Sequence, residues 1–173
     1  MTIQDAQNML SPARFAPSPQ NWLDLGCGSG TFTLALAANL PQGSKITAID
    51  QEPQQLPTHS DNGISISFIQ ADMEMTYLGL NQKVDGILLA NALHYVANQK
   101  AFLQEWSGQM HPAASFILIE YDTRAANPWV PYPIPFNELP DLFGVADHQI
   151  TKIGERSSIY GNNKMYAAQI WRS

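Results

Sequence analysis

The chain has little cysteine and little positive charge, and each shortage excludes a class of function. Cys27 is the only cysteine among 173 residues, so no disulfide can form within the chain. A lone cysteine is typical of the reducing cytoplasm, where we expect this protein. Nine lysines and arginines stand against fifteen acidic residues, for a net charge of −6. Because binding to nucleic acid requires a basic face, the sequence argues against nucleic acid as a partner.

Long apolar runs and metal-ligand patterns are missing as well. No run approaches 18 apolar residues and no basic-plus-apolar leader opens the chain, so we expect neither membrane insertion nor export. His59, His111 and His148 have no metal-ligand spacing with one another or with Cys27, which argues against a metal site. Apolar residues still make up 45% of the chain, enough for the core of a single domain over 1–173.

What the sequence does contain is an alternation of strand-like and helix-like segments. Strand patterns cover 21–25, 45–50, 64–69, 84–90, 116–121 and stretches within 147–160 and 164–172. Helical patterns cover 3–10, 31–40, 98–110 and 136–143, and a short helix is expected within 51–62. The alternation predicts an α/β fold, a doubly wound and mostly parallel Rossmann-like sheet of seven strands. A turn over 161–163 predicts that the last two strands form an antiparallel C-terminal hairpin.

Three glycines follow the first of these strands directly. Gly26, Gly28 and Gly30 alternate with other residues and lead into the helix at 31–40. Glycines let the backbone turn sharply and bring bare peptide groups against a ligand, and a helix N-terminus adds unpaired N–H groups. The pattern predicts a nucleotide-like cofactor here, with a tight structural turn as the alternative. A dinucleotide-binding pattern would need a glycine where Thr31 stands, which argues against NAD.

The pattern Asp24-x-Gly26-x-Gly28-x-Gly30 resembles the first motif of the class I S-adenosylmethionine-dependent methyltransferases. The segment Asn91-Ala92-Leu93-His94-Tyr95-Val96 resembles the corresponding part of small-molecule methyltransferases related to quinone biosynthesis. The resemblance covers about residues 21–122 and, more weakly, the last hairpin. It implies S-adenosylmethionine as the cofactor and in-line transfer of its methyl group. Because the methyl carbon is already electrophilic, alignment of the acceptor can supply most of the catalysis.

Acidic residues at the ends of three successive strands supply the expected cofactor contacts. Asp50 can accept hydrogen bonds from both ribose hydroxyls, or it can cap a turn. The resemblance implies that Asp72 accepts from the adenine amino group while the Met73 N–H donates to a ring nitrogen, a capped turn over 73–78 being the alternative. Asp24 would lie near the cofactor's ammonium, directly or through water. The expected cofactor-binding residues are Asp24, Gly26, Cys27, Gly28, Gly30, Asp50, Gln51, Asp72, Met73 and Asn91.

The methyl acceptor is expected beside the fourth and fifth strands. His94 could accept a proton as a general base, or it could pack at the strand–helix junction. Residues 123–136 combine prolines with aromatic side chains, which suits a small, flat or apolar acceptor, a plug against the sheet, or a dimer contact. The expected acceptor-binding residues are His94, Tyr95, Tyr121, Trp129 and Tyr132, with His94 and Tyr132 as the candidates for catalysis.

Two segments and two weaker candidates complete the prediction. Residues 1–20 are expected to be a short entry or lid segment, and residues 123–143 an insertion on the acceptor side. Arg14 could bind the cofactor's carboxylate or lie free on the surface, and Glu120 could tune an acceptor hydroxyl. Cys27 is expected to pack beneath the glycine loop rather than to react.

The sequence therefore predicts a methyltransferase that acts on a small, aromatic or apolar molecule. Three alternatives stay open at this stage: a nicotinamide-dependent oxidoreductase, a protein or RNA methyltransferase, and a cofactor-binding module without activity. The residue at Thr31 disfavours the first alternative, and the acidic balance disfavours an RNA acceptor. A homodimer is also left open.

Overall fold

A computed structural model describes residues 1–75, 82–144, 148–157 and 164–172, and it contains one seven-stranded sheet. The strands stand in the order β3-β2-β1-β4-β5-β7-β6. Their bounds are Asn21–Leu25 (β1), Lys45–Asp50 (β2), Ser65–Gln70 (β3), Val84–Ala90 (β4), Met110–Tyr121 (β5), His148–Ser157 (β6) and Lys164–Arg172 (β7). The first five strands are parallel, and β7 runs antiparallel to both β5 and β6. The predicted fold class is confirmed.

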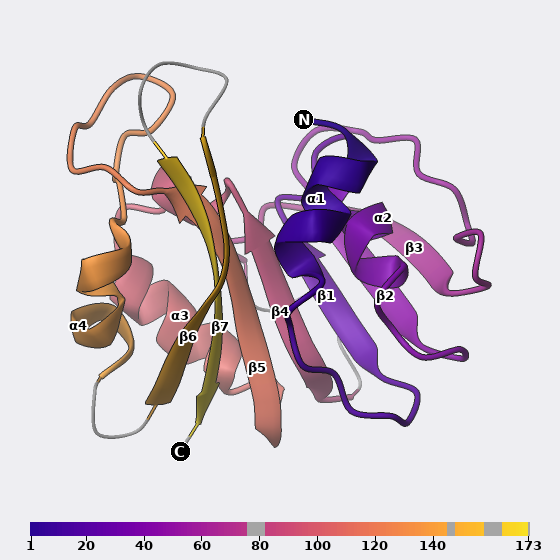
Figure 1. The fold of residues 1–173 in the computed structure, drawn as a ribbon. Helices are drawn as coiled ribbons and strands as arrows, with labels where there is room; N and C mark the ends of the chain where they lie inside the picture. Colours follow the sequence, from indigo (N-terminus) through magenta and orange to yellow (C-terminus); the bar gives the residue numbers. More distant parts are fainter. Residues whose placement is uncertain (76–81, 145–147, 158–163, 173) are drawn as a thin grey trace.

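Helices cover both faces of the sheet, as Figure 1 shows. Helices α1 (Ile3–Leu10) and α2 (Thr31–Ala37) pack on one face, and α3 (Gln99–Ser107) and α4 (Leu139–Phe143) on the other. Because side chains alternate along a strand, Leu88 packs in the apolar cluster beneath α1 and α2, while Leu89 packs in the cluster beneath α3 and α4. The continuous apolar run of β4 is therefore buried on both sides, as in other parallel sheets.

The structure corrects several predicted boundaries. Helix α2 ends at Ala37 instead of residue 40, and residues 51–62 contain no helix. Strand β5 begins at Met110, so α3 ends earlier than the helical pattern suggested. The strand pattern was hidden by Pro112, which lies in an irregular pairing between Val84–Met110 and Gly86–Ser115. The predicted turn at 161–163 and the end of the one at 73–78 lie outside the described residues.

The topology reverses direction at β1, and this positions the ligand site. Strand β1 lies between β2 and β4, so the chain winds outward to one side and then to the other. Open α/β sheets bind their ligands beyond the carboxyl ends of the strands at such a switch point. Gly26 follows β1 and Asn91 follows β4, so the predicted glycine loop lies at this point.

The N-terminal segment is held against the opposite side of the sheet from α3 and α4. Helix α1 begins with a capping box in which the Thr2 hydroxyl accepts from the Asp5 N–H and Asp5 accepts from the Thr2 N–H. The Gln169 side chain on β7 bonds both the N–H and the carbonyl of Arg14, each at 2.8 Å. These bonds fix residues near Arg14 to the sheet.

Candidate functional site

A cleft opens at the carboxyl ends of β1, β2 and β4 and has a volume of about 440 Å³. Its walls contain most of the predicted cofactor-binding residues. The lining residues are Gly26, Asp50, Gln51, Asp72, Met73, Glu74, Asn91, Ala92 and Tyr95. Sequence reasoning had missed Glu74 and Ala92, which adjoin predicted residues along the chain, and had placed Tyr95 only on the acceptor side. Arg14 and the other residues of 1–20 do not line this cleft.

Gly26 is required by a close approach between two loops. Its φ is +73°, a conformation that residues with side chains rarely adopt. A Cβ atom at this position would lie 2.6 Å from the Cβ of Ala92, far inside van der Waals contact. The loops after β1 and β4 can therefore form one wall of the cleft only because residue 26 lacks a side chain.

Asp50 and Asp72 shape the same cleft through backbone hydrogen bonds. The Gly28 N–H donates to Oδ2 of Asp50 at 2.8 Å, and the Glu52 N–H donates to Oδ1 at 3.0 Å. Oδ1 of Asp72 accepts from the Glu74 N–H at 2.9 Å, so this residue also caps a turn. Because each carboxylate oxygen has two lone pairs, both side chains retain capacity to accept from a ligand.

Met73 and Asn91 bring unused polar groups to the cleft. The Trp106 indole N–H donates to the Met73 carbonyl at 3.0 Å, which holds the backbone of Met73 in place. Within the described part of the chain, no hydrogen bond uses the Met73 N–H or the buried Oδ1 of Asn91. Asn91 also has a φ of +54°. Unpartnered buried polar atoms and an unfavourable backbone conformation are frequent at ligand sites.

The remaining predicted cofactor residues, Asp24, Cys27, Gly28 and Gly30, do not line the cleft. Gly30 has a φ of +83° and a Cβ there would overlap Leu56, so it is required where the loop enters α2. Burial, and then the charges of Asp24 and Asp50, raise the pKa of the Cys27 thiol to about 12. Little thiolate forms at neutral pH, which agrees with a packing role for this cysteine.

Asp24 is fully buried beneath the glycine loop. The Thr33 hydroxyl donates to its Oδ2 at 2.6 Å, while its buried Oδ1 has no partner among the described residues. Burial raises the pKa of the Asp24 carboxyl to about 7, against the opposing effect of the Thr33 hydrogen bond, and the charge of Asp50 raises it further. Asp24 therefore lies behind the cleft as a carboxyl group that titrates near neutral pH.

A second and larger cavity, of about 840 Å³, adjoins the cleft. The two share Asn91 and Tyr95 as lining residues, so they meet at the loop after β4. The residues that line this second cavity are Asn91, His94, Tyr95, Tyr121, Thr123, Asn127, Trp129 and Val130. Four of the residues predicted for the acceptor are among them. Thr123, Asn127 and Val130 were missed, and their only sequence signal was their position beside Tyr121 and Trp129.

Trp129 and Tyr132 were predicted together, but the structure separates them. Asn127 and Val130 exchange backbone hydrogen bonds, and Oδ1 of Asn127 also accepts from the N–H groups of Trp129 and Val130. This tight turn presents Trp129, 75% exposed, at the edge of the cavity. Tyr132 lines neither cavity. Its contribution is a backbone N–H that donates to the His94 carbonyl at 3.0 Å.

His94 is held by Glu120 of the neighbouring strand. Nδ1 of His94 lies 2.6 Å from Oε2 of Glu120, and the His94 N–H donates to Oε1 at 3.3 Å. Both side chains are almost completely buried. The rings of Tyr95 and Tyr121 lie 4.4 and 6.1 Å from the His94 ring. Glu120 is thus engaged with His94 and does not line the cavity itself.

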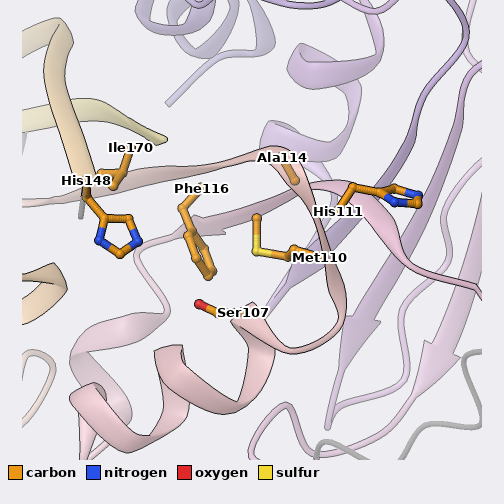
Figure 2. Close-up of a pocket in the computed structure, with 7 residues that line it drawn as sticks. All are labelled: Ser107, Met110, His111, Ala114, Phe116, His148 and Ile170. Atoms are coloured by element: carbon orange, nitrogen blue, oxygen red, sulfur yellow. The ribbon is translucent and has the colours of Figure 1, made fainter. Parts of the chain in front are cut away.

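The other histidines form no comparable site. Figure 2 shows His148 and His111 at opposite ends of a small cavity of about 10 Å³, with Phe116 and Met110 between their rings. Within the described residues, no group of three or more His, Cys, Asp or Glu side chains could hold a metal ion. Among the same residues, no helix is long and apolar enough to span a membrane.

Several solved structures with a similar fold are methyltransferases. A 1,6-didemethyltoxoflavin-N1-methyltransferase from Burkholderia thailandensis is 18% identical, with a TM-score of 0.66 over 99% of this chain and 77% of that one. The magnesium protoporphyrin IX methyltransferase of Synechocystis PCC 6803 is 16% identical, with a TM-score of 0.63 over 96% and 77%. An arsenic(III) S-adenosylmethionine methyltransferase from Chlamydomonas reinhardtii is 14% identical, with a TM-score of 0.64 over 92% and 65%.

Comparison of sequences gives the family. No curated protein matches the chain. The model of the methyltransferase domain family matches residues 23–118, which include the glycine loop, Asp50, Asp72 and the segment at 91–96. This confirms the predicted resemblance to class I methyltransferases and excludes the oxidoreductase alternative, whereas kinship with the quinone-biosynthesis group stays a prediction. On this match, which covers more than half of its length, the chain belongs to the methyltransferase domain family.

Proposed function

We propose that this protein transfers the methyl group of S-adenosylmethionine to a small aromatic molecule. The observation that carries the proposal is the pair of adjoining cavities that meet at Asn91 and Tyr95. A methyl donor in the first and an acceptor in the second would face each other across this shared wall. The donor supplies an electrophilic methyl group, and the protein's task is alignment and exclusion of water.

The lining of the first cavity suits S-adenosylmethionine. Asp50 would accept from the ribose hydroxyls, and Asp72 and the unpartnered Met73 N–H would offer an acceptor beside a donor to the edge of adenine. Gly26 leaves room for the methionine part, and Oδ1 of Asn91 is free to accept from a donor group there. Glu74, Gln51 and Ala92 complete the walls.

Asp24, Cys27, Gly28 and Gly30 would support this site from behind. Asp24 lies under the loop with an unpartnered oxygen, so any effect on the donor's ammonium would act through water or through the loop. Residues 1–20 stay a candidate entry segment that would have to move to cover the cleft.

The second cavity favours a small acceptor over a macromolecule. Its volume of about 840 Å³ lies within the range of small-molecule sites, and the rings of His94, Tyr95, Tyr121 and Trp129 suit a flat ligand. Thr123, Asn127, Trp129 and Val130 line it, which supports our proposal that residues 123–143 are an acceptor-side insertion. A protein acceptor would need an extended groove, and an RNA acceptor is disfavoured by the net charge of −6.

Calorimetry followed by a turnover assay tests the proposal. We expect the protein to bind S-adenosylmethionine and S-adenosylhomocysteine with micromolar affinity and NAD far more weakly. With S-adenosylmethionine and a panel of hydroxylated and nitrogen-containing aromatic compounds, S-adenosylhomocysteine should accumulate. Binding of NAD in preference to both sulfur compounds would contradict the proposal. Tight binding without turnover of any small, peptide or RNA acceptor would favour a cofactor-binding module instead.

A further inference from the structure

Behind the wall of the acceptor cavity, the buried carboxylate of Glu120 bonds a single residue, His94, and the proposed function does not yet explain this pairing. Both oxygens of Glu120 bond His94, one through the ring Nδ1 at 2.6 Å and one through the backbone N–H at 3.3 Å. Glu120 is buried, and burying a carboxylate is costly unless it is paired. A histidine needed only for packing would not require such a partner, because an apolar side chain fills the same space.

The pairing determines which ring nitrogen is available. Because the Glu120 carboxylate accepts the proton on Nδ1, neutral His94 carries its lone pair on Nε2. In the described part of the chain no hydrogen bond uses Nε2, and His94 lines the 840 Å³ cavity. The cavity therefore has one wall that can accept a proton, and the adjacent carboxylate stabilises the imidazolium that results.

Two other titratable side chains near this pair, Tyr166 and Asp122, already have partners among the described residues. Burial, and then the charge of Glu120, raise the pKa of the Tyr166 phenol above its usual range, so this hydroxyl keeps its proton and donates to the Ile134 carbonyl. Asp122 accepts from the Phe136 N–H at 2.9 Å and lies 3.9 Å from Nζ of Lys152. The rings of Tyr95 and Tyr121 flank the His94 ring, with centroids 4.4 and 6.1 Å from its own.

We infer that His94 is a general base positioned by Glu120, and that the methyl acceptor therefore carries a proton on its nucleophilic atom. This inference rests on the proposed function, and it narrows the acceptor to flat molecules with a hydroxyl or ring N–H group. Thiols, which ionise readily, and arsenic(III) need no general base, so the His94–Glu120 pair would not accelerate their methylation.

The step balances as follows. The lone pair of the acceptor oxygen or nitrogen forms a bond to the methyl carbon, and the electrons of the carbon–sulfur bond pass to sulfur, which becomes a neutral thioether. The proton of the acceptor passes to Nε2 of His94 and from the imidazolium to solvent. Glu120 exchanges no atom with the acceptor: it holds the ring and stabilises the imidazolium.

An acceptor-independent measurement tests the arrangement first. Nuclear magnetic resonance of ¹⁵N-labelled histidine should show His94 with a proton on Nδ1 and none on Nε2 at high pH in the wild-type protein. Glu120→Gln should redistribute the proton between the two nitrogens, while His111→Gln, at an exposed position at the other end of β5, should leave the His94 signals unchanged. A His94 ring protonated on Nε2 when neutral would overturn the inference whatever the acceptor.

Kinetics then compare hydroxyl or N–H acceptors with thiols of similar ring structure. For the protic acceptors, Glu120→Gln and His94→Gln should lower kcat on the order of 10²–10⁴-fold with little change in the KM for S-adenosylmethionine. The loss should shrink as the pH rises and the acceptor ionises by itself, and added imidazole should partly rescue His94→Ala. His111→Gln should retain the wild-type rate.

The failures of the two proposals are distinguishable. Wild-type protein that binds S-adenosylhomocysteine and methylates thiols better than hydroxyl compounds, or variants that keep full kcat at low pH, would overturn the role of the pair alone. Wild-type protein that does not bind S-adenosylhomocysteine would remove the proposed function itself. Unchanged S-adenosylhomocysteine affinity in Glu120→Gln and His94→Gln shows that these variants are folded.

Discussion

The Cβ of Ala92 stands 2.6 Å from the point where a side chain on Gly26 would begin. Two loops that are far apart in the sequence, one after β1 and one after β4, are brought this close by adjacent parallel strands. The contact closes the cleft in which we place the methyl donor. A Cβ on Gly30 would meet the flexible end of the Leu56 side chain, whereas the Ala92 Cβ beside Gly26 is fixed to the backbone and cannot move aside.

Gly26→Ala should therefore destabilise the protein and abolish donor binding. The positive φ alone costs about 1–2 kcal/mol for an alanine, and the overlap with Ala92 adds about 1–3 kcal/mol. Gly63→Ala is the matched control, because Gly63 has a φ of +80° but no atom within 4 Å of a Cβ. Urea unfolding and calorimetry with S-adenosylhomocysteine measure both effects. Equal loss of stability in the two variants would show that the close approach does not matter.

Asp50→Ala should weaken donor binding by about 1–3 kcal/mol, the usual cost of leaving buried polar groups without a partner. The side chain lines the cleft and also accepts from the Gly28 and Glu52 N–H groups, so contact with ribose and loop geometry are lost together. Calorimetry with S-adenosylhomocysteine gives the affinity, and the exposed Asp61→Ala serves as control. An affinity that stays at the wild-type value would remove Asp50 from the ribose role.

Trp129→Ala should weaken binding of the acceptor and leave binding of the methyl donor unchanged. Loss of the Trp129 ring should raise the KM for the acceptor by about tenfold to a hundredfold. This factor corresponds to the free energy gained when a large apolar side chain is buried. Tyr132→Ala is the control, since Tyr132 lies on the same segment but lines neither cavity. Steady-state kinetics at saturating donor separates the two variants. If Tyr132→Ala raised the acceptor KM and Trp129→Ala did not, the assigned acceptor cavity would be wrong.

Asp24 should make the free energy of unfolding fall as the pH rises, whereas most carboxylates in folded proteins have the opposite effect. Its pKa is raised from 3.8 in the unfolded chain to about 7 in the folded one, mainly by burial. The folded state therefore binds more protons between these values, and the contribution of Asp24 to stability is present below pH 3.8 and is lost as the pH rises through 7.

Asp24→Asn removes this dependence. Relative to wild type, the variant should gain free energy of unfolding as the pH rises from 4 to 8, by on the order of 4 kcal/mol at most. Urea unfolding across this range measures the difference, with Asp61→Asn as an exposed control. Parallel curves for wild type and Asp24→Asn would show that the buried carboxyl does not titrate in this range.

Local patterns in the sequence were enough for the strands, for most of the helices and for the family. Strands such as 21–25 and 84–90 are recognised by their apolar composition, and the glycine loop by the positive φ that Gly26, Gly28 and Gly30 allow. Both properties depend on only a few neighbouring residues. Where a proline interrupted the pattern, as Pro112 does in β5, the prediction of the strand's beginning was wrong.

The glycine motif, Asp50, Asp72 and the aromatic segment after the fifth strand were thus determined by the sequence alone, since each depends on residue type and on order along the chain. Only the tertiary structure decided that Asp24 and Gly30 lie behind the cleft, that Trp129 lines the second cavity while Tyr132 does not, and that Glu120 binds His94. These outcomes depend on how β4 and β5 pair and on which face each side chain takes. A shift by one residue would turn Glu120 to the other face of the sheet and away from His94.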